Sequence, residues 1–141
     1  IEQKKAPLGV IGLVYVVLPV AVLFAEAGFN VLGVETRATQ VERINAGLCP
    51  IGGEEPGLAE RLAEGVRVGR LRATADYARL RDRDVVLICV ETPVDEDHKP
   101  RYEALRSALR SLGPVMKDGA LVIVESTIAP RTMQTVVLPL L

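Results

Sequence analysis

A glycine and an acidic residue near the N-terminus have the types and the spacing of a dinucleotide-binding site. Gly12 follows a short apolar run, and Glu35 closes a second apolar run. In nucleotide-binding βαβ units a glycine makes the tight turn after the first strand, and an acid roughly 20 residues later binds the adenosine ribose hydroxyls. Gly12 and Glu35 match that spacing. The alternative for Glu35 is a surface acid at a strand end.

The glycine-rich turn departs from the usual Gly-x-Gly-x-x-Gly pattern at two positions, because its residues are Gly12, Val14 and Val17. The second glycine lets the backbone approach a pyrophosphate, and the third lets helix and strand pack closely. We expect Val14 to project toward the pyrophosphate, at a cost of about 1–2 kcal/mol if its φ is positive. We expect Val17 to press the helix off the strand, at a cost of roughly 1–3 kcal/mol. Both predict weakened binding of the dinucleotide, with Val14 the larger cause.

Apolar runs alternate with helical patterns along the whole chain of 141 residues. Strands are expected at 8–13, 30–34, 71–74, 85–90 and 120–124. Helices are expected at 15–27, 40–46, 56–64, 76–80, 102–112 and 132–138. This alternation predicts a doubly wound, Rossmann-type α/β fold, with a parallel sheet and helices on both faces. The length predicts a single domain over residues 1–141.

The composition argues against several classes of function. The chain has 17 basic and 18 acidic residues, for a net charge of −1, which is unlike a nucleic-acid binder. Cys49 and Cys89 form no CxxC pair and His98 is the one histidine, so no metal site is expected. Cys89 stands in an apolar run and is expected to be a buried core thiol. Two cysteines used in this way suit a reducing cytoplasm.

The uncharged stretch 6–25 is as long as a membrane span or a signal peptide. Gly9, Gly12 and Pro19 interrupt it, and the predicted sheet needs it as the central strand. We therefore expect a buried strand and helix here, and no membrane segment.

Three segments resemble the UDP-glucose/GDP-mannose dehydrogenase family. Residues 9–21, GVIGLVYVVLPVA, are similar to its Gly-Leu-Gly-Tyr-Val-Gly-Leu-Pro fingerprint, and residues 89–93, CVETP, resemble its Thr-Pro motif. Residues 125–130, ESTIAP, resemble its Ser-Thr-x-x-Pro-Gly-Thr motif, with Arg131 in place of the glycine. The Glu-Ser-Thr form and the 95–100 loop look most like the members that oxidise UDP-N-acetylhexosamines.

This resemblance implies oxidation of the C6 alcohol of a nucleotide sugar to a carboxylate, with two NAD+ and a cysteine thiohemiacetal. It implies that Thr127 is catalytic and positions a water molecule. The implied cofactor contacts are Gly12, Val14, Tyr15, Val16, Glu35, Arg37, Thr92 and Glu125. Arg37 could stack near the adenine or meet a phosphate, and the alternative is a solvated cation at a helix start. The nucleophilic cysteine, the catalytic lysine and most sugar contacts belong to later domains of the family, which this chain lacks.

Two other hypotheses remain open from the sequence. The apolar ending, VVLPLL, suggests a truncation, and the chain could be a truncated or engineered scaffold that keeps the fold without binding the cofactor. It could also self-associate, for example as a homodimer, through apolar surfaces that would otherwise meet the missing domains.

Overall fold

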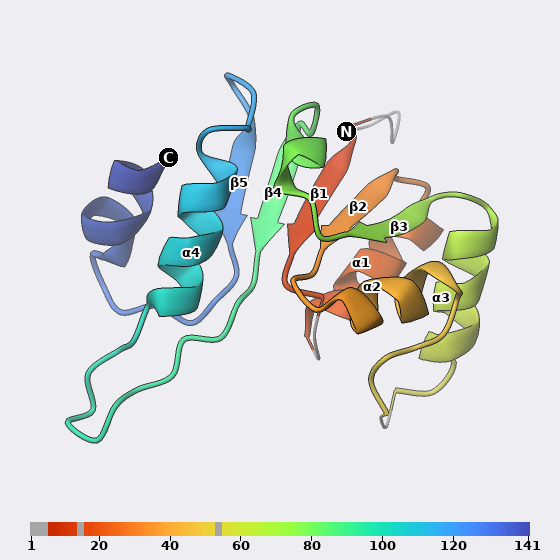
Figure 1. The fold of residues 1–141 in the computed structure, drawn as a ribbon, viewed down its shortest axis with the longest axis horizontal. Coiled ribbons are helices and arrows are strands. Elements are labelled where there is room, and N and C mark those ends of the chain that lie inside the picture. Colours follow the sequence, from red (N-terminus) through yellow and green to blue (C-terminus); the bar gives the residue numbers. More distant parts are fainter. Residues whose placement is uncertain (1–5, 14–15, 53–54) are drawn as a thin grey trace.

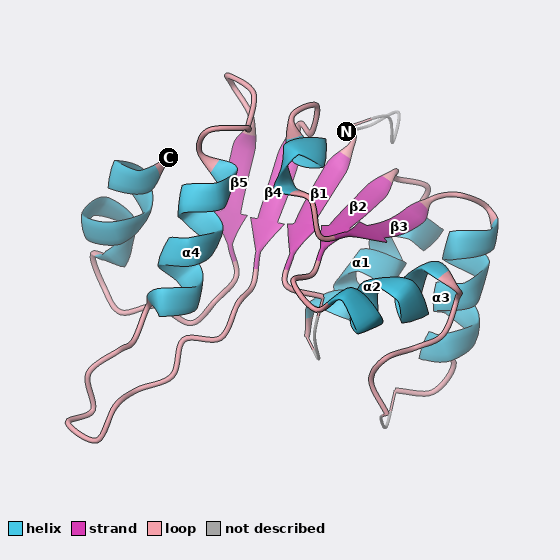
Figure 2. Ribbon diagram, viewed as in Figure 1, coloured by secondary structure: helices cyan, strands magenta, loops and turns pink. Residues whose placement is uncertain are grey.

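A parallel sheet lies at the centre of this computed structural model, which describes residues 6–13, 16–52 and 55–141 (Figures 1 and 2). Its strand order is β3-β2-β1-β4-β5, and every neighbouring pair is parallel. The strands are β1 (Leu8–Ile11), β2 (Val31–Val34), β3 (Leu71–Thr74), β4 (Val85–Ile88) and β5 (Leu121–Val124). The order reverses between β1 and β4, so the carboxyl ends of these two strands form a topological switch point, where open α/β sheets bind ligands.

The helices cover both faces of this sheet. They are α1 (Val17–Glu26), α2 (Ala38–Asn45), α3 (Leu58–Arg67) and α4 (Glu103–Leu112), with a short 3-10 helix, η1, at Tyr77–Leu80. Leu8 and Val10 of β1 belong to an apolar core shared with α1, α2 and α3. Ile11 of β1 belongs to a second core, shared with α4 and η1. Side chains of β1 therefore enter both cores, one on each face of the sheet. The predicted doubly wound α/β fold is confirmed.

The segment with the composition of a membrane span contributes β1 and α1. Leu8 and Val10 in β1 and Leu18 in α1 are almost completely buried against the rest of the protein. In the part of the chain that the structure describes, no helix is both long and apolar enough to cross a membrane.

Most helices differ by one or two residues from their predicted extents, and two differ more substantially. Helix α3 was expected to stop before Gly65 but continues to Arg67, and Gly69, with a φ of +74°, follows its end. Gly65 packs beside Ala25 of α1 and Leu71 of β3, so the helix continues through it against both elements. The last predicted helix, 132–138, is a π-helical turn at Met133–Val137 followed by a 3-10 turn at Leu138–Leu140. Pro139 has no N–H to donate, so a regular α-helix cannot continue there.

Gly65→Ala is expected to raise the free energy of unfolding by about 0.5–1 kcal/mol, because alanine favours the helix and restricts the unfolded chain. A Cβ at this position would lie 3.5 Å from the Cβ atoms of Ala25 and Leu71, which is ordinary van der Waals contact. Urea unfolding measures the change. Gly65→Val is the matched control, because a branched side chain would overfill the same gap, and a stabilising valine would contradict this account of the packing.

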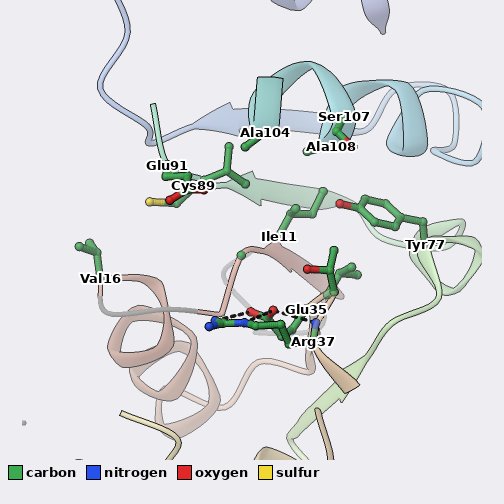
Figure 3. A pocket seen from close by; sticks show the side chains of 14 residues that line it. Ile11, Val16, Glu35, Arg37, Tyr77, Cys89, Glu91, Ala104, Ser107 and Ala108 are labelled. Atoms are coloured by element: carbon green, nitrogen blue, oxygen red, sulfur yellow. Dashed lines mark hydrogen bonds and ion pairs between the residues drawn. The ribbon is translucent and has the colours of Figure 1, made fainter. Parts of the chain in front are cut away.

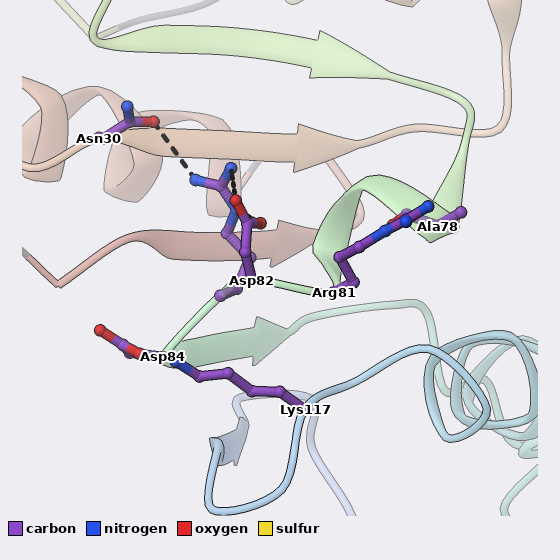
Figure 4. A network of polar contacts seen from close by, with 7 residues as sticks. Asn30, Ala78, Arg81, Asp82, Asp84 and Lys117 are labelled. Carbon is purple, nitrogen blue, oxygen red and sulfur yellow. Dashed lines mark hydrogen bonds and ion pairs between the residues drawn. The ribbon is translucent and has the colours of Figure 1, made fainter.

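Polar contacts close the opposite end of the sheet, where the strands begin (Figure 4). Arg83, just before β4, donates from Nη1 to Oδ1 of Asn30 at 3.3 Å and pairs through Nε with Oδ1 of Asp82 at 3.1 Å. Lys117, in the turn before β5, pairs with Asp84. These contacts join the amino ends of β2, β4 and β5, and they leave the carboxyl ends as the open side of the sheet.

Candidate functional site

A cleft of about 730 Å³ lies at the carboxyl ends of β1, β2 and β4. Small-molecule sites in proteins typically have volumes of about 300–1,000 Å³. Gly12 lines the cleft from the end of β1. Figure 3 shows Glu35, from the end of β2, and Cys89, from the end of β4. Tyr77 of η1 and Ala108 of α4 form the facing wall. The cleft is therefore at the switch point of the sheet.

The turn after β1 can be made only by glycine. Gly12 has a φ of +94°, and a Cβ on it would lie 2.2 Å from the carbonyl oxygen of Cys89. Its N–H donates to the carbonyl oxygen of Val34 at 3.0 Å, which fixes the turn to β2. Val16 lines the cleft, with 64% of its surface exposed. Val14 and Tyr15, two expected cofactor contacts, lie outside the described residues.

Glu35 presents a buried carboxylate at the end of β2, with 5% of its surface exposed. The backbone N–H of Arg37 and its side-chain Nε both donate to Oε1 of Glu35 at 3.0 Å. Burial acts to raise the pKa of this carboxyl, but the hydrogen bonds and charge of Arg37 outweigh it and lower the pKa below its ordinary value. Glu35 is therefore ionised at neutral pH and can accept a hydrogen bond from a hydroxyl group.

An apolar wall faces this carboxylate, and its residues were missed by the sequence analysis. Tyr77 is held by a turn in which Asp76 accepts from the backbone N–H of Ala78 at 2.9 Å. Burial and the charge of Glu35 raise the pKa of Tyr77, which keeps its phenol neutral. Ala104 and Ala108 lie one helical turn apart on α4 and line the same wall. The sequence signal that could have indicated this wall is the pair of small residues, Ala104 and Ala108, on one face of the helix. Small side chains there allow a ligand to lie close to the helix.

The loops after β4 and β5 are joined by side-chain hydrogen bonds. The Ser126 hydroxyl accepts from the backbone N–H of Val90 at 2.9 Å and donates to the carbonyl oxygen of Val90 at 2.8 Å. The Thr92 hydroxyl donates to the carbonyl oxygen of Thr127 at 2.7 Å. Thr92, Glu125 and Thr127 do not line the described cleft, and Glu125 and Thr127 are exposed. Their cofactor and catalytic roles stay predictions.

Cys89 is half-buried and lines the cleft, which corrects the expectation of a buried core thiol. It follows Ile88, the last residue of β4, where the strand opens into the cleft. Burial and the charge of Glu125 raise the pKa of the thiol, so it is a poor nucleophile at neutral pH. Cys49 is also half-buried, and its thiol donates to the carbonyl oxygen of Ile51 at 3.3 Å.

Arg131 has a φ of +71°, and this left-handed conformation explains the glycine of the similar motif. Its carbonyl oxygen accepts from the backbone N–H groups of Gln134 and Thr135, both at 3.0 Å, and so begins the last helical turn. Arg131→Gly is expected to raise the free energy of unfolding by about 1 kcal/mol, because glycine removes the steric cost of this conformation. Thermal unfolding measures it, with Arg131→Ala as the matched control that loses the charge and keeps the strain. Equal stabilisation by alanine would contradict the backbone explanation.

The parallel sheet, the Gly12 turn and the acid at the end of β2 define a dinucleotide-binding domain of the Rossmann type. The chain belongs to the UDP-glucose/GDP-mannose dehydrogenase family, because the model of that family's NAD binding domain matches residues 6–141. NAD is therefore the cofactor of this class of domain.

Similar proteins include the UDP-N-acetyl-D-mannosamine dehydrogenase of Pyrococcus horikoshii, 39% identical over 90% of this chain and 30% of that protein. The GDP-mannose 6-dehydrogenase of Pseudomonas savastanoi is 36% identical over 95% of this chain and 31% of its own length. A solved structure of the Pyrococcus horikoshii enzyme has a TM-score of 0.88 at 38% identity, and covers 95% of this chain and 31% of that one. The chain therefore spans about a third of the length of these relatives.

Proposed function

We propose that this chain is the cofactor domain of a nucleotide-sugar 6-dehydrogenase, that it binds NAD in the cleft, and that it is not catalytically complete alone. The observation that carries the proposal is the buried, ionised carboxylate of Glu35, which faces the cleft across from the Gly12 turn. A dinucleotide needs an acceptor for its ribose hydroxyls and a close backbone approach for its pyrophosphate. Glu35 supplies the acceptor, and the Gly12 turn lies at the same switch point.

When bound, NAD+ supplies the hydride acceptor for oxidation of the sugar alcohol. Within this domain, Glu35 accepts a hydrogen bond from the adenosine ribose, and the wall of Tyr77 and Ala108 excludes water from the base. Thr127 is proposed to position a water molecule, and Glu125 to lie beside the cofactor. A UDP-N-acetylhexosamine is the proposed substrate, with UDP-glucose as the second choice, on the basis of the Glu-Ser-Thr segment at 125–127.

Calorimetric titration of the chain with NAD+ tests the proposal, together with NMR shift mapping of the backbone amides. We expect saturable binding with shifts concentrated at Gly12, Glu35 and Tyr77. Binding is expected to be weak, because Val14 occupies the glycine position of the motif that meets the pyrophosphate, whereas Val17 packs in the apolar core. Absence of both heat and amide shifts at millimolar NAD+ would favour the alternative of a scaffold that keeps the fold without its cofactor.

Self-association is a second candidate property, and one observation favours it. On the edge strand β5, Leu121 is 52% exposed and Ile123 is 37% exposed. An unpaired sheet edge with apolar side chains can pair with a second chain. Sedimentation velocity over a range of concentrations tests for a homodimer, and a monomer throughout would contradict it. A cytoplasmic location remains a prediction that follows from the use of cysteine.

A further inference from the structure

We propose that Arg37 is a positioning residue that fixes the Glu35 carboxylate, so that the cleft accepts an adenosine ribose with a free 2′-hydroxyl and rejects one that carries a 2′-phosphate. This selectivity rests on the proposed function, since it concerns the ribose end of the same cofactor site. It assigns Arg37 to the protein's own carboxylate rather than to a phosphate of the ligand.

The geometry of the pair gives the two carboxylate oxygens of Glu35 different roles. Oε1 accepts from the backbone N–H and the Nε of Arg37, both at 3.0 Å (Figure 3). Oε2 has a longer contact, 3.5 Å to Nη2 of Arg37. Because a carboxylate oxygen accepts about two hydrogen bonds, Oε2 is the oxygen better placed to accept from a ribose hydroxyl. The two donors of Arg37 on Oε1 keep the carboxylate from rotating.

The same pair opposes a 2′-phosphate. Among the described residues that line the cleft, Arg37 is the only cation, and Glu35 and Glu91 are both acidic. A phosphate at the 2′ position would place further negative charge beside a carboxylate that is 5% exposed. If the Arg37 guanidinium turned to the phosphate, the buried carboxylate would lose its cationic partner, which is strongly unfavourable. If Arg37 stayed on Glu35, the two anions would repel each other.

The pairing of Arg37 with Glu35, called the clamp below, can be tested without any ligand, because it affects the pKa of Glu35. Burial raises the pKa of Glu35, whereas the side-chain hydrogen bond and charge of Arg37, its backbone N–H and a hydrogen bond from Thr36 lower it. Arg37→Met removes the first two of these lowering effects and keeps the backbone N–H. Among the described residues, the other titratable groups that line the cleft are Tyr77 on η1 and Cys89 and Glu91 after β4. None of these is a cation at neutral pH, so loss of Arg37 leaves burial unopposed by any cation from the cleft lining. The pKa of Glu35 is then expected to rise.

The experiment compares the unaltered chain with Arg37→Met, which removes the charge and keeps a similar stem, and with Arg37→Lys, which keeps the charge without the planar fork. Urea unfolding first establishes that each variant folds. The Glu35 carboxyl is then titrated by NMR without ligand. NAD+ and NADP+ are titrated separately by calorimetry from about pH 5 to about pH 8, the range in which a raised glutamate pKa becomes visible.

We expect the unaltered chain to bind NAD+ at least about 100-fold more tightly than NADP+. In Arg37→Met the Glu35 pKa should rise, NAD+ affinity should fall about tenfold at neutral pH and further toward acid pH, and NADP+ affinity should not improve. Arg37→Lys should recover part of the NAD+ affinity. Comparable NADP+ binding by the unaltered chain, lost in Arg37→Met, would overturn the proposal by making Arg37 a phosphate ligand.

The pairing of Arg37 with Glu35 and the ribose selectivity are contradicted by different results. An unchanged Glu35 pKa in Arg37→Met overturns the clamp, even if NAD+ binds. If neither dinucleotide binds, the proposed function and the ribose selectivity fail together, whereas a raised Glu35 pKa in Arg37→Met still supports the clamp itself.

Discussion

Gly12→Ala is expected to lower the free energy of unfolding by about 3 kcal/mol, since a left-handed backbone costs about 1–2 kcal/mol and overpacking roughly 1–3 kcal/mol. The φ of Gly12 is +94°, and the added Cβ would lie 2.2 Å from the carbonyl oxygen of Cys89. That oxygen cannot retreat easily, because its peptide group is held by the Val90 N–H, which donates to the Ser126 hydroxyl at 2.9 Å. NAD+ binding should be lost as well, since the turn cannot keep its path. Urea unfolding and calorimetry measure the two effects.

Gly119→Ala is the matched control for this substitution. Gly119 has a similar left-handed φ of +77°, but nothing lies within 4 Å of its ideal Cβ position. It belongs to the exposed turn before β5, away from the cleft. The control therefore measures backbone strain alone, expected to be about 1 kcal/mol. If Gly12→Ala costs no more than Gly119→Ala, the contact between the Gly12 turn and the end of β4 is not the cause.

The sequence was sufficient for the order of the elements and for Gly12 and Glu35, the two residues that line the cleft at the ends of β1 and β2. Gly12 and Glu35 are recognisable because each follows a short apolar strand, and their roles depend on the local path of the chain. The same reasoning misjudged Gly65, which was expected to end a helix. A glycine in a helix is ambiguous by itself, and here the decision comes from Ala25 and Leu71, which approach it from distant parts of the chain.

The opposite wall of the cleft could not be predicted for a related reason. Tyr77 and Ala108 are separated by β4 and a long loop, and they meet only because the chain crosses back to the other side of β1 after β3. Arg37 presents a different case. Its position after the ribose acid suggested a ligand contact, but the pairing with Glu35 depends on the extended backbone at Arg37, where φ is −84° and ψ is 109°. No residue pattern in the sequence specifies that side-chain direction.

Replacing the two motif valines by glycine is expected to change different properties: stability at Val17 and NAD+ affinity at Val14. Val17 is 1% exposed and packs in the same apolar core as Val10 and Leu13. Val17→Gly should therefore lower the free energy of unfolding by about 2–3 kcal/mol, through lost burial and weaker helix propensity. Val17→Ala is the control, and it should cost about 1 kcal/mol less, because alanine keeps the helix propensity.

Val14→Gly should instead tighten NAD+ binding by about tenfold, because removal of roughly 1–2 kcal/mol of backbone and side-chain conflict corresponds to that change in affinity. Val14 lies outside the described residues, so this expectation comes from its place in the motif. Calorimetry on the two single variants and the double variant separates the effects. The double variant should bind as tightly as Val14→Gly and be as unstable as Val17→Gly, since the two substitutions act on different quantities. An affinity gain from Val17→Gly alone would instead mean that the packing of α1, rather than the approach to the pyrophosphate, limits cofactor binding.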